Sequence, residues 1–191
     1  WKQDIGIDMR GKSKILKKSY RSASDHIKLS LEFLKTDADL QSEVIKFYDG
    51  EEGIENVNTS SNSIGFFEGY YKEIDILLDK LINGLGYKYK DILVLADSWK
   101  VAEDFQKILS PSIRNYVKIG KDIDEECLNV TTYHSSKGLE NKIVILLNIN
   151  NIDDKKLIYV GMTRASERLY IHSDSYEFGN AYILKELASK I

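Results

Sequence analysis

Polar side chains gather behind one predicted strand of this chain in a pattern that suits a charged ligand. Residues 128–132 read as a short strand, and the loop that follows carries hydroxyl groups, His134 and Lys137. Gly138 lets the backbone approach a ligand closely, because glycine has no side chain. We expect a ligand at this loop, since α/β proteins place their sites at the ends of sheet strands.

Two arginines stand in settings that suit a phosphate group. Arg164 lies within residues 157–171, a largely apolar stretch, and Arg21 follows Tyr20 just after a predicted strand. Phosphoryl transfer depends mainly on positioning and charge stabilisation, and the planar guanidinium group binds phosphate oxygens with two parallel N–H groups. Taken alone, Arg164 is more often a surface salt-bridging residue and Arg21 a solvated charge, so a phosphate role for either of them depends on a wider pattern of motifs.

Residues 6–13, Gly-Ile-Asp-Met-Arg-Gly-Lys-Ser, match the GxxxxGK[ST] pattern of a phosphate-binding loop. Asp97, at the end of a later apolar run, would then be a magnesium ligand, and the chain would be a self-contained NTPase. Such a loop needs a buried strand before it and a helix after it. Residues 1–5 are too polar for a central strand, and residues 14–22 have no apolar helical stripe. We therefore favour a helix start at Asp97 and Ser98, and keep the self-contained NTPase as a weaker alternative.

Short apolar strands alternate with helices along the chain, which predicts an α/β fold with a mainly parallel sheet. The predicted strands are 14–18, 92–96, 116–119, 128–132, 143–147 and 168–172. The predicted helices are 22–34, 40–47, 67–85, 99–109, 155–165 and 182–191. We expect Gly84 to end the third helix in a left-handed conformation.

The charge balance excludes an overall basic coat. The 191 residues carry 27 Lys and Arg against 30 Asp and Glu, a net charge of −3, so any nucleic-acid site must be local. Residues 1–35 hold nine of the basic residues against four acidic ones, which indicates a basic N-terminal edge or simply a solvated face.

The single cysteine, Cys127, excludes an internal disulfide and a zinc site built from cysteines. It fits a reducing compartment, and we expect a cytoplasmic protein. No apolar run approaches the roughly 20 residues of a membrane span, so we expect no membrane partner. Because the first residue is Trp1 and not Met, we expect the chain to be a fragment of a longer protein.

Several segments resemble motifs of the UvrD/Rep-like superfamily 1 DNA helicases, in the order in which that family has them. Residues 19–22 resemble motif IV, 91–98 the strand called IVa, 131–140 motif V and 159–165 motif VI. The resemblance covers about residues 10–172, and motifs V and VI are specific. It implies the second RecA-like motor domain of such a helicase, with a three-layer RecA-like fold over residues 1–191 as one domain.

The resemblance implies that ATP lies between this domain and the N-terminal RecA-like domain of the same polypeptide. That first domain would carry the P-loop, the water-activating glutamate and most of the contacts to Mg²⁺. By position, Arg164 would be the arginine finger on the γ-phosphate and Arg21 a second γ-phosphate contact. Tyr20 would stack on the adenine, while Gly138 and Glu140 would complete the ATP site. Glu140 would bond the ribose or help to couple the nucleotide to DNA.

The resemblance also implies that Thr132, His134 and Lys137 contact the backbone of single-stranded DNA. Such contacts carry no base information, as a translocating motor requires. Helicases of this family insert a subdomain between motifs IVa and V, whereas only eighteen residues lie between Leu109 and Leu128 here. We therefore expect no large insertion, and movement along a single strand is better supported than unwinding.

The resemblance implies a DNA-dependent ATPase whose C-terminal motor domain is inactive on its own, with a role in DNA repair. The alternative is a catalytically inactive module that kept the fold for nucleic-acid binding or regulation. The net charge of −3 and the missing insertion are compatible with that alternative.

Overall fold

The computed structural model describes residues 18–19, 24–48, 55–56 and 64–191. Three predicted features therefore lie outside the described residues: the phosphate-loop pattern at 6–13, most of the predicted strand at 14–18, and the pair Tyr20 and Arg21. Among the described residues, no helix is both long enough and apolar enough to span a membrane.

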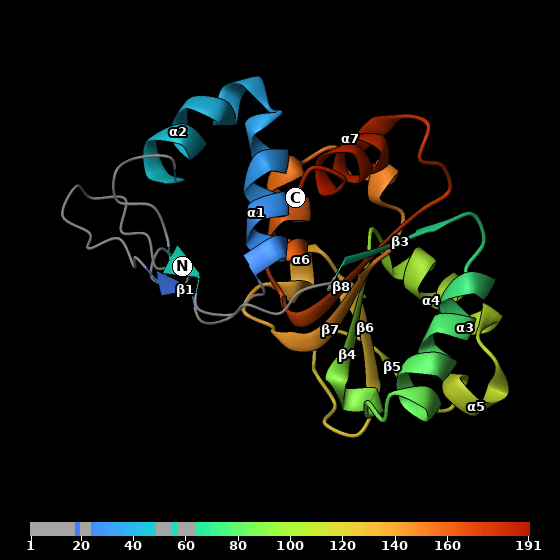
Figure 1. Ribbon diagram of the computed structural model, residues 1–191. Coiled ribbons are helices and arrows are strands. Elements are labelled where there is room, and N and C mark those ends of the chain that lie inside the picture. The colour runs from blue at the N-terminus through green and yellow to red at the C-terminus, as the bar shows by residue number, and fades with distance from the viewer. Residues whose placement is uncertain (1–17, 20–23, 49–54, 57–63) are drawn as a thin grey trace.

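A parallel sheet of six strands forms the centre of the molecule (Figure 1). In spatial order its strands are β3 (Ile64–Glu68), β8 (Ala165–Ser173), β7 (Asn141–Leu146), β4 (Ile92–Ala96), β6 (Leu128–Thr132) and β5 (Val117–Ile119). Every neighbouring pair is parallel. A separate parallel pair consists of β1 (Lys18–Ser19) and β2 (Glu55–Asn56). The predicted α/β fold with a mainly parallel sheet is confirmed.

Helices cover both faces of this sheet (Figure 1). One face carries α1 (Ser24–Lys35), α6 (Lys155–Met162) and α7 (Gly179–Ala188), and α2 (Ala38–Tyr48) packs on α1. The other face carries α3 (Lys72–Asp79), the π-helical turn Lys80–Gly84, α4 (Trp99–Ile108) and α5 (Pro111–Arg114). Short 3-10 turns lie at Tyr89–Asp91, His134–Ser136 and Ile149–Asn151. The architecture is thus three layered.

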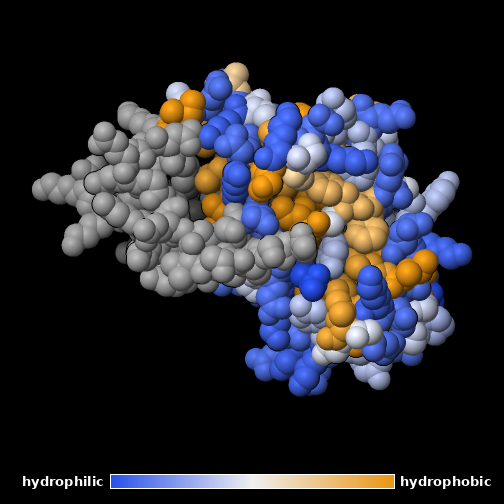
Figure 2. All heavy atoms as spheres, in the orientation of Figure 1, coloured by the Kyte–Doolittle hydropathy of each residue, from blue (hydrophilic) through white to orange (hydrophobic). Residues whose placement is uncertain are grey.

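Alternate residues of each central strand enter one of two cores, as strand geometry requires. In β4, Leu93 and Leu95 face the helices α1, α6 and α7, whereas Ile92, Val94 and Ala96 face α3, α4 and α5. All five are buried, which explains why the run is apolar throughout. Figure 2 shows hydrophilic residues over most of the periphery and a hydrophobic band across the middle of this face, beside the grey atoms.

The predicted helix over 67–85 is wrong in its first part, because residues 64–68 form the edge strand β3. This strand pairs with β8, about a hundred residues further along the chain, and the ring of Phe67 packs edge-on against Tyr170 at 5.7 Å. Gly65 permits the close approach, since an added Cβ would lie 2.6 Å from Tyr170 Cδ1. A pairing this distant leaves no local pattern in the sequence.

Helix ends also differ from the predictions. The π-helical turn ends at Gly84 as expected, but the left-handed conformation falls on Gly86, with a φ of 74°. The predicted helix 155–165 ends at Met162, because Ala165 already pairs with β7 as the first residue of β8. Between α4 and β6 the chain forms only α5 and β5.

Buried His172, near the end of β8, predicts a loss of stability at acidic pH. The Asn148 N–H can only donate, so His172 Nδ1 accepts this bond at 3.4 Å and Nε2–H donates to the Gly69 carbonyl at 2.8 Å. Burial lowers the pKa of His172, although the Gly69 contact and the charge of Asp174 act in the opposite direction. The folded state therefore takes up this proton at a lower pH than the unfolded state.

The contribution of His172 to the free energy of unfolding should be complete above about pH 6.5 and fall as pH falls through the folded pKa. Urea unfolding of the wild type and of His172→Gln at pH 7.5, 6.5 and 5.5 measures this contribution as the difference between the two. An equal fall in both proteins would exclude the assignment.

Candidate nucleotide and nucleic-acid site

The loop predicted to bind a ligand crosses the sheet along the direction of its strands. It runs from the side where the parallel strands end, here called the carboxyl edge, to the side where they begin, here called the amino edge. Strands β6 and β7 are both parallel to β4, so the carboxyl end of β6 and the amino end of β7 lie at opposite edges. Residues 133–140 connect these two ends. Thr132 and His134 therefore lie at the carboxyl edge of the sheet, and Glu140 lies at the amino edge. The residues predicted at the start and at the end of this loop therefore lie at opposite edges of the sheet.

At the amino edge, Arg164 lies beside the end of this loop. It occupies the turn between α6 and β8, and its carbonyl accepts a hydrogen bond from the Asn141 N–H at 3.0 Å. The half-buried guanidinium donates to three oxygens: Nε to the Val160 carbonyl at 2.9 Å, Nη1 to the Leu139 carbonyl at 3.2 Å, and Nη2 to Thr163 Oγ1 at 3.3 Å. The structure thus brings the predicted ATP residues Glu140 and Arg164 to the same edge, with Gly138 two residues before Glu140 in the loop.

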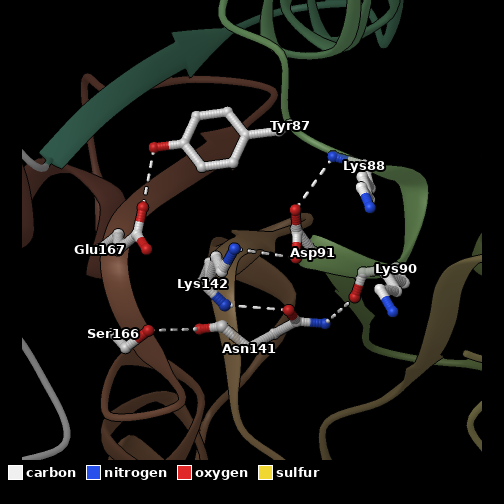
Figure 3. A network of polar contacts seen from close by, with 8 residues as sticks. All are labelled: Tyr87, Lys88, Lys90, Asp91, Asn141, Lys142, Ser166 and Glu167. Carbon is white, nitrogen blue, oxygen red and sulfur yellow. Dashed lines mark hydrogen bonds and ion pairs between the residues drawn. The ribbon is translucent and has the colours of Figure 1, made fainter.

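Asn141 ties three strands together at this amino edge (Figure 3). Its Nδ2 donates to the Lys90 carbonyl at 3.0 Å, just before β4, and its Oδ1 accepts from the Lys142 N–H at 2.9 Å. Ser166 Oγ of β8 donates to the Asn141 carbonyl at 3.4 Å. A polar network therefore joins the strands that begin just after Glu140 and Arg164.

An ion pair extends the same network (Figure 3). Lys142 Nζ lies 3.2 Å from Asp91 Oδ1, and the Lys88 N–H donates to Asp91 Oδ2 at 3.0 Å. Partial burial works against ionisation of Asp91, but the contacts with Lys88 and Lys142 prevail and lower the pKa of the carboxyl. Tyr87 OH donates to Glu167 Oε2 at 2.9 Å on the other side. The amino edge is thus a polar surface of fixed geometry.

At the carboxyl edge, a hollow of about 160 Å³ opens beside the turn that carries His134. Its lining consists of Asp97, Tyr133, His134, Asn151, Ile152, Asp153, Asp154 and Leu157. His134 and Lys137 are exposed, whereas Thr132 is only 6% exposed. Thr132 Oγ1 accepts from the Ser135 N–H at 3.3 Å and donates to Ser135 Oγ at 3.1 Å. The Thr132 hydroxyl therefore holds the turn and does not face the surface.

The interpretation of Asp97 and Ser98 as a helix start is confirmed. Ser98 is the N-cap of α4, and its Oγ accepts from the Val101 N–H at 3.3 Å. Asp97 accepts from Ser98 Oγ at 2.9 Å and from Asn151 Nδ2 at 3.0 Å. No group of three His, Cys, Asp or Glu side chains suited to a metal ion occurs in the described part of the chain.

Two residues of this region had no expected role in the sequence. Tyr133 is 2% exposed and its ring packs against Gly161 of α6, and Asn141 ties three strands together. Their partners lie 28 residues and 51 residues away. The only local signal is that Tyr133 begins a loop rich in polar residues and Asn141 directly follows it.

The chain therefore has a parallel sheet covered by helices on both faces, with an arginine held beside the end of the loop that resembles motif V. Residues 128–172 match the family model of the UvrD-like helicase C-terminal domain, and this match spans β6, the loop, Arg164 and most of β8. The resemblance to that domain is confirmed for this segment, and the observed sheet with helices on both faces confirms the three-layer fold class.

Among solved structures, the chain resembles the C-terminal domain of a possible DNA helicase from Lactobacillus plantarum WCFS1. The TM-score is 0.55 at 19% identity, over 81% of this chain and 87% of the other. At this identity the likeness concerns the fold alone.

Two curated relatives are DNA-processing proteins. The chain is 30% identical over 115 residues to the ATP-dependent DNA helicase Rep of Buchnera aphidicola subsp. Baizongia pistaciae, covering 52% of this chain and 17% of the relative. It is 30% identical over 112 residues to the RecBCD enzyme subunit RecB of Chlamydia muridarum, covering 56% of this chain and 10% of the relative. The matched part thus spans less than a fifth of either relative.

Proposed function

We propose that this chain is the C-terminal motor domain of an ATP-dependent DNA helicase or translocase that acts in the cytoplasm. The observation that carries the proposal is the position of Arg164, which the backbone holds beside Glu140 in a segment that matches the UvrD-like helicase C-terminal domain. A second motor domain needs such a cation at an edge that a nucleotide-binding domain can approach.

In this proposal ATP binds against the amino edge, with the N-terminal RecA-like domain of the longer protein on its other side. Arg164 turns from the Leu139 and Val160 carbonyls to the γ-phosphate, where it stabilises the charge of the transition state. Gly138 lets the loop approach the nucleotide, and Glu140 accepts from the ribose. Tyr20 stacks on the adenine and Arg21 adds a second γ-phosphate contact.

In this proposal Mg²⁺ is held mainly by the N-terminal domain, as the resemblance of the motifs implies. When bound, the ion neutralises charge on the phosphates. The contribution of this chain is the orientation of Arg164 and the exclusion of water from one side of the nucleotide.

Single-stranded DNA contacts the turn at the carboxyl edge in this proposal. His134 and Lys137 are exposed there and donate to phosphate oxygens, while Thr132 holds the turn from inside. Asp97, Asp153 and Asp154 line the adjacent hollow, so their charge keeps phosphate out of the hollow itself. DNA and nucleotide thus meet opposite ends of one loop.

The proposal is tested first against the self-contained NTPase. The 191-residue chain alone should hydrolyse ATP at a negligible rate, and Lys12→Ala should leave its weak nucleotide affinity unchanged. Isothermal titration with ATP and Mg²⁺, together with a phosphate-release assay, measures both. Hydrolysis by the chain alone that Lys12→Ala abolishes would support the phosphate-loop interpretation and overturn the proposal.

A further inference from the structure

We propose that Tyr133 is a positioning residue, which determines through its contact with Gly161 where α6 holds Arg164. The inference rests on the proposed function, because it concerns the placing of the same arginine. Tyr133 stands between Thr132 and His134, and the proposed function gives it no role.

The ring of Tyr133 packs so closely against Gly161 that no side chain fits between them. A Cβ added at Gly161 would lie 3.1 Å from Tyr133 Cε1 and 3.0 Å from Leu146 Cδ2. Carbon atoms in contact prefer separations of about 3.5–4.0 Å. The ring of Tyr133 therefore occupies the space that any side chain at Gly161 would need, and α6 approaches the sheet as closely as this ring allows.

Tyr133 is fixed at both of its ends. Its N–H donates to the Ala96 carbonyl at 3.1 Å, and its hydroxyl donates to the Leu147 carbonyl at 3.2 Å. Its own carbonyl accepts from Ser136 Oγ at 2.7 Å, inside the turn that carries His134. Burial raises the pKa of the phenol well above its ordinary value, so the hydroxyl stays a donor. The ring is thus a rigid support joined to the turn.

Gly161 lies in the last turn of α6, and Arg164 follows three residues later in the turn that leads to β8. The Gly161 carbonyl accepts from the Arg164 N–H at 3.1 Å, and Arg164 Nε donates to the Val160 carbonyl at 2.9 Å. A displacement of α6 at Gly161 therefore moves Arg164 with it. Close-packed interiors transmit such displacements, and a misplacement of 1 Å can cost about 100-fold in rate.

The test enlarges the side chain at Gly161 and reduces the one at Tyr133 in the full-length protein. Gly161→Ala should lower kcat of DNA-stimulated ATP hydrolysis by about tenfold, since a displacement of less than 1 Å costs part of that 100-fold. The KM for ATP and the Kd for a single-stranded oligonucleotide should change by less than about twofold. The double variant Gly161→Ala/Tyr133→Leu should recover most of kcat, and Tyr133→Phe, which keeps the ring, should stay near the wild type.

Gly84→Ala is the matched control, because a Cβ there meets only Lys80 Cγ at 3.7 Å. Its kcat should equal that of the wild type. If Gly161→Ala does not fold, Tyr133→Leu alone replaces it, and a kcat equal to that of the wild type would overturn the inference. Failure of the double variant to recover, or equal losses in kcat and DNA affinity, would also overturn it. A wild-type protein without DNA-stimulated hydrolysis would instead overturn the proposed function.

Discussion

Arg164→Ala in the full-length protein should lower the rate of ATP hydrolysis by about 10³–10⁵-fold, the effect of an arginine finger in other NTPases. The guanidinium stabilises charge that develops in the transition state, so its loss should affect kcat far more than ATP binding. Steady-state hydrolysis at saturating single-stranded DNA, together with titration of a fluorescent ATP analogue, separates the two quantities. Arg164→Lys should recover only part of the rate, because an ammonium group lacks the planar pair of donors.

Arg168→Ala is the matched control for Arg164. Arg168 lies four residues further along, in β8, where its Nε donates to Tyr87 OH at 3.2 Å and its guanidinium lies over the Tyr87 ring. Its contacts are structural, so its removal should leave kcat within a few-fold of the wild type. Equal losses from both variants, or a loss at Arg164 confined to ATP affinity, would contradict an arginine finger at this position.

Phe105→Ala should lower the free energy of unfolding by about 3–5 kcal/mol, the usual cost of removing a buried phenylalanine ring. Phe105 of α4 is 0% exposed, and its ring packs edge-on against Tyr71 at 5.5 Å. The truncation leaves a cavity that the close-packed helices α3 and α4 cannot fill. Urea unfolding followed by circular dichroism measures the change.

Ile108→Ala serves as the control for Phe105, since Ile108 lies on the same helix and is 51% exposed. Its substitution should change the free energy of unfolding by no more than about 0.5 kcal/mol. A comparable loss in both variants would show that the helix, and not the core beneath it, limits stability.

The central strands β4 and β7 could be predicted from the sequence because burial on both faces leaves an unbroken apolar run in each of them. The predictions at 92–96 and 128–132 coincide with β4 and β6. The edge strand β3 was missed, since its pairing with β8 is a long-range contact and its aromatic residues also fit a helical pattern. Helix ends were displaced for the same reason: Ala165 is drawn into β8 by its pairing with Asn141.

The residue types of the candidate site could be predicted, but not their arrangement. The loop order and the apolar setting of Arg164 drew attention to both segments, and the structure places them side by side through Leu139. Nothing in the spacing shows that the loop crosses the sheet, because this depends on which strands are neighbours. The contact of Tyr133 with Gly161 and the inward hydroxyl of Thr132 also exist only in the folded chain.

The most direct measurement is ATP hydrolysis by the full-length protein with and without single-stranded DNA. If DNA at His134 and nucleotide at Arg164 meet opposite ends of one loop, hydrolysis should rise strongly when DNA is added. The rise should saturate with DNA concentration and weaken with added salt, as backbone contacts require. A rate that stays negligible with every nucleic acid tested would contradict the motor and would leave a fold retained for binding or regulation.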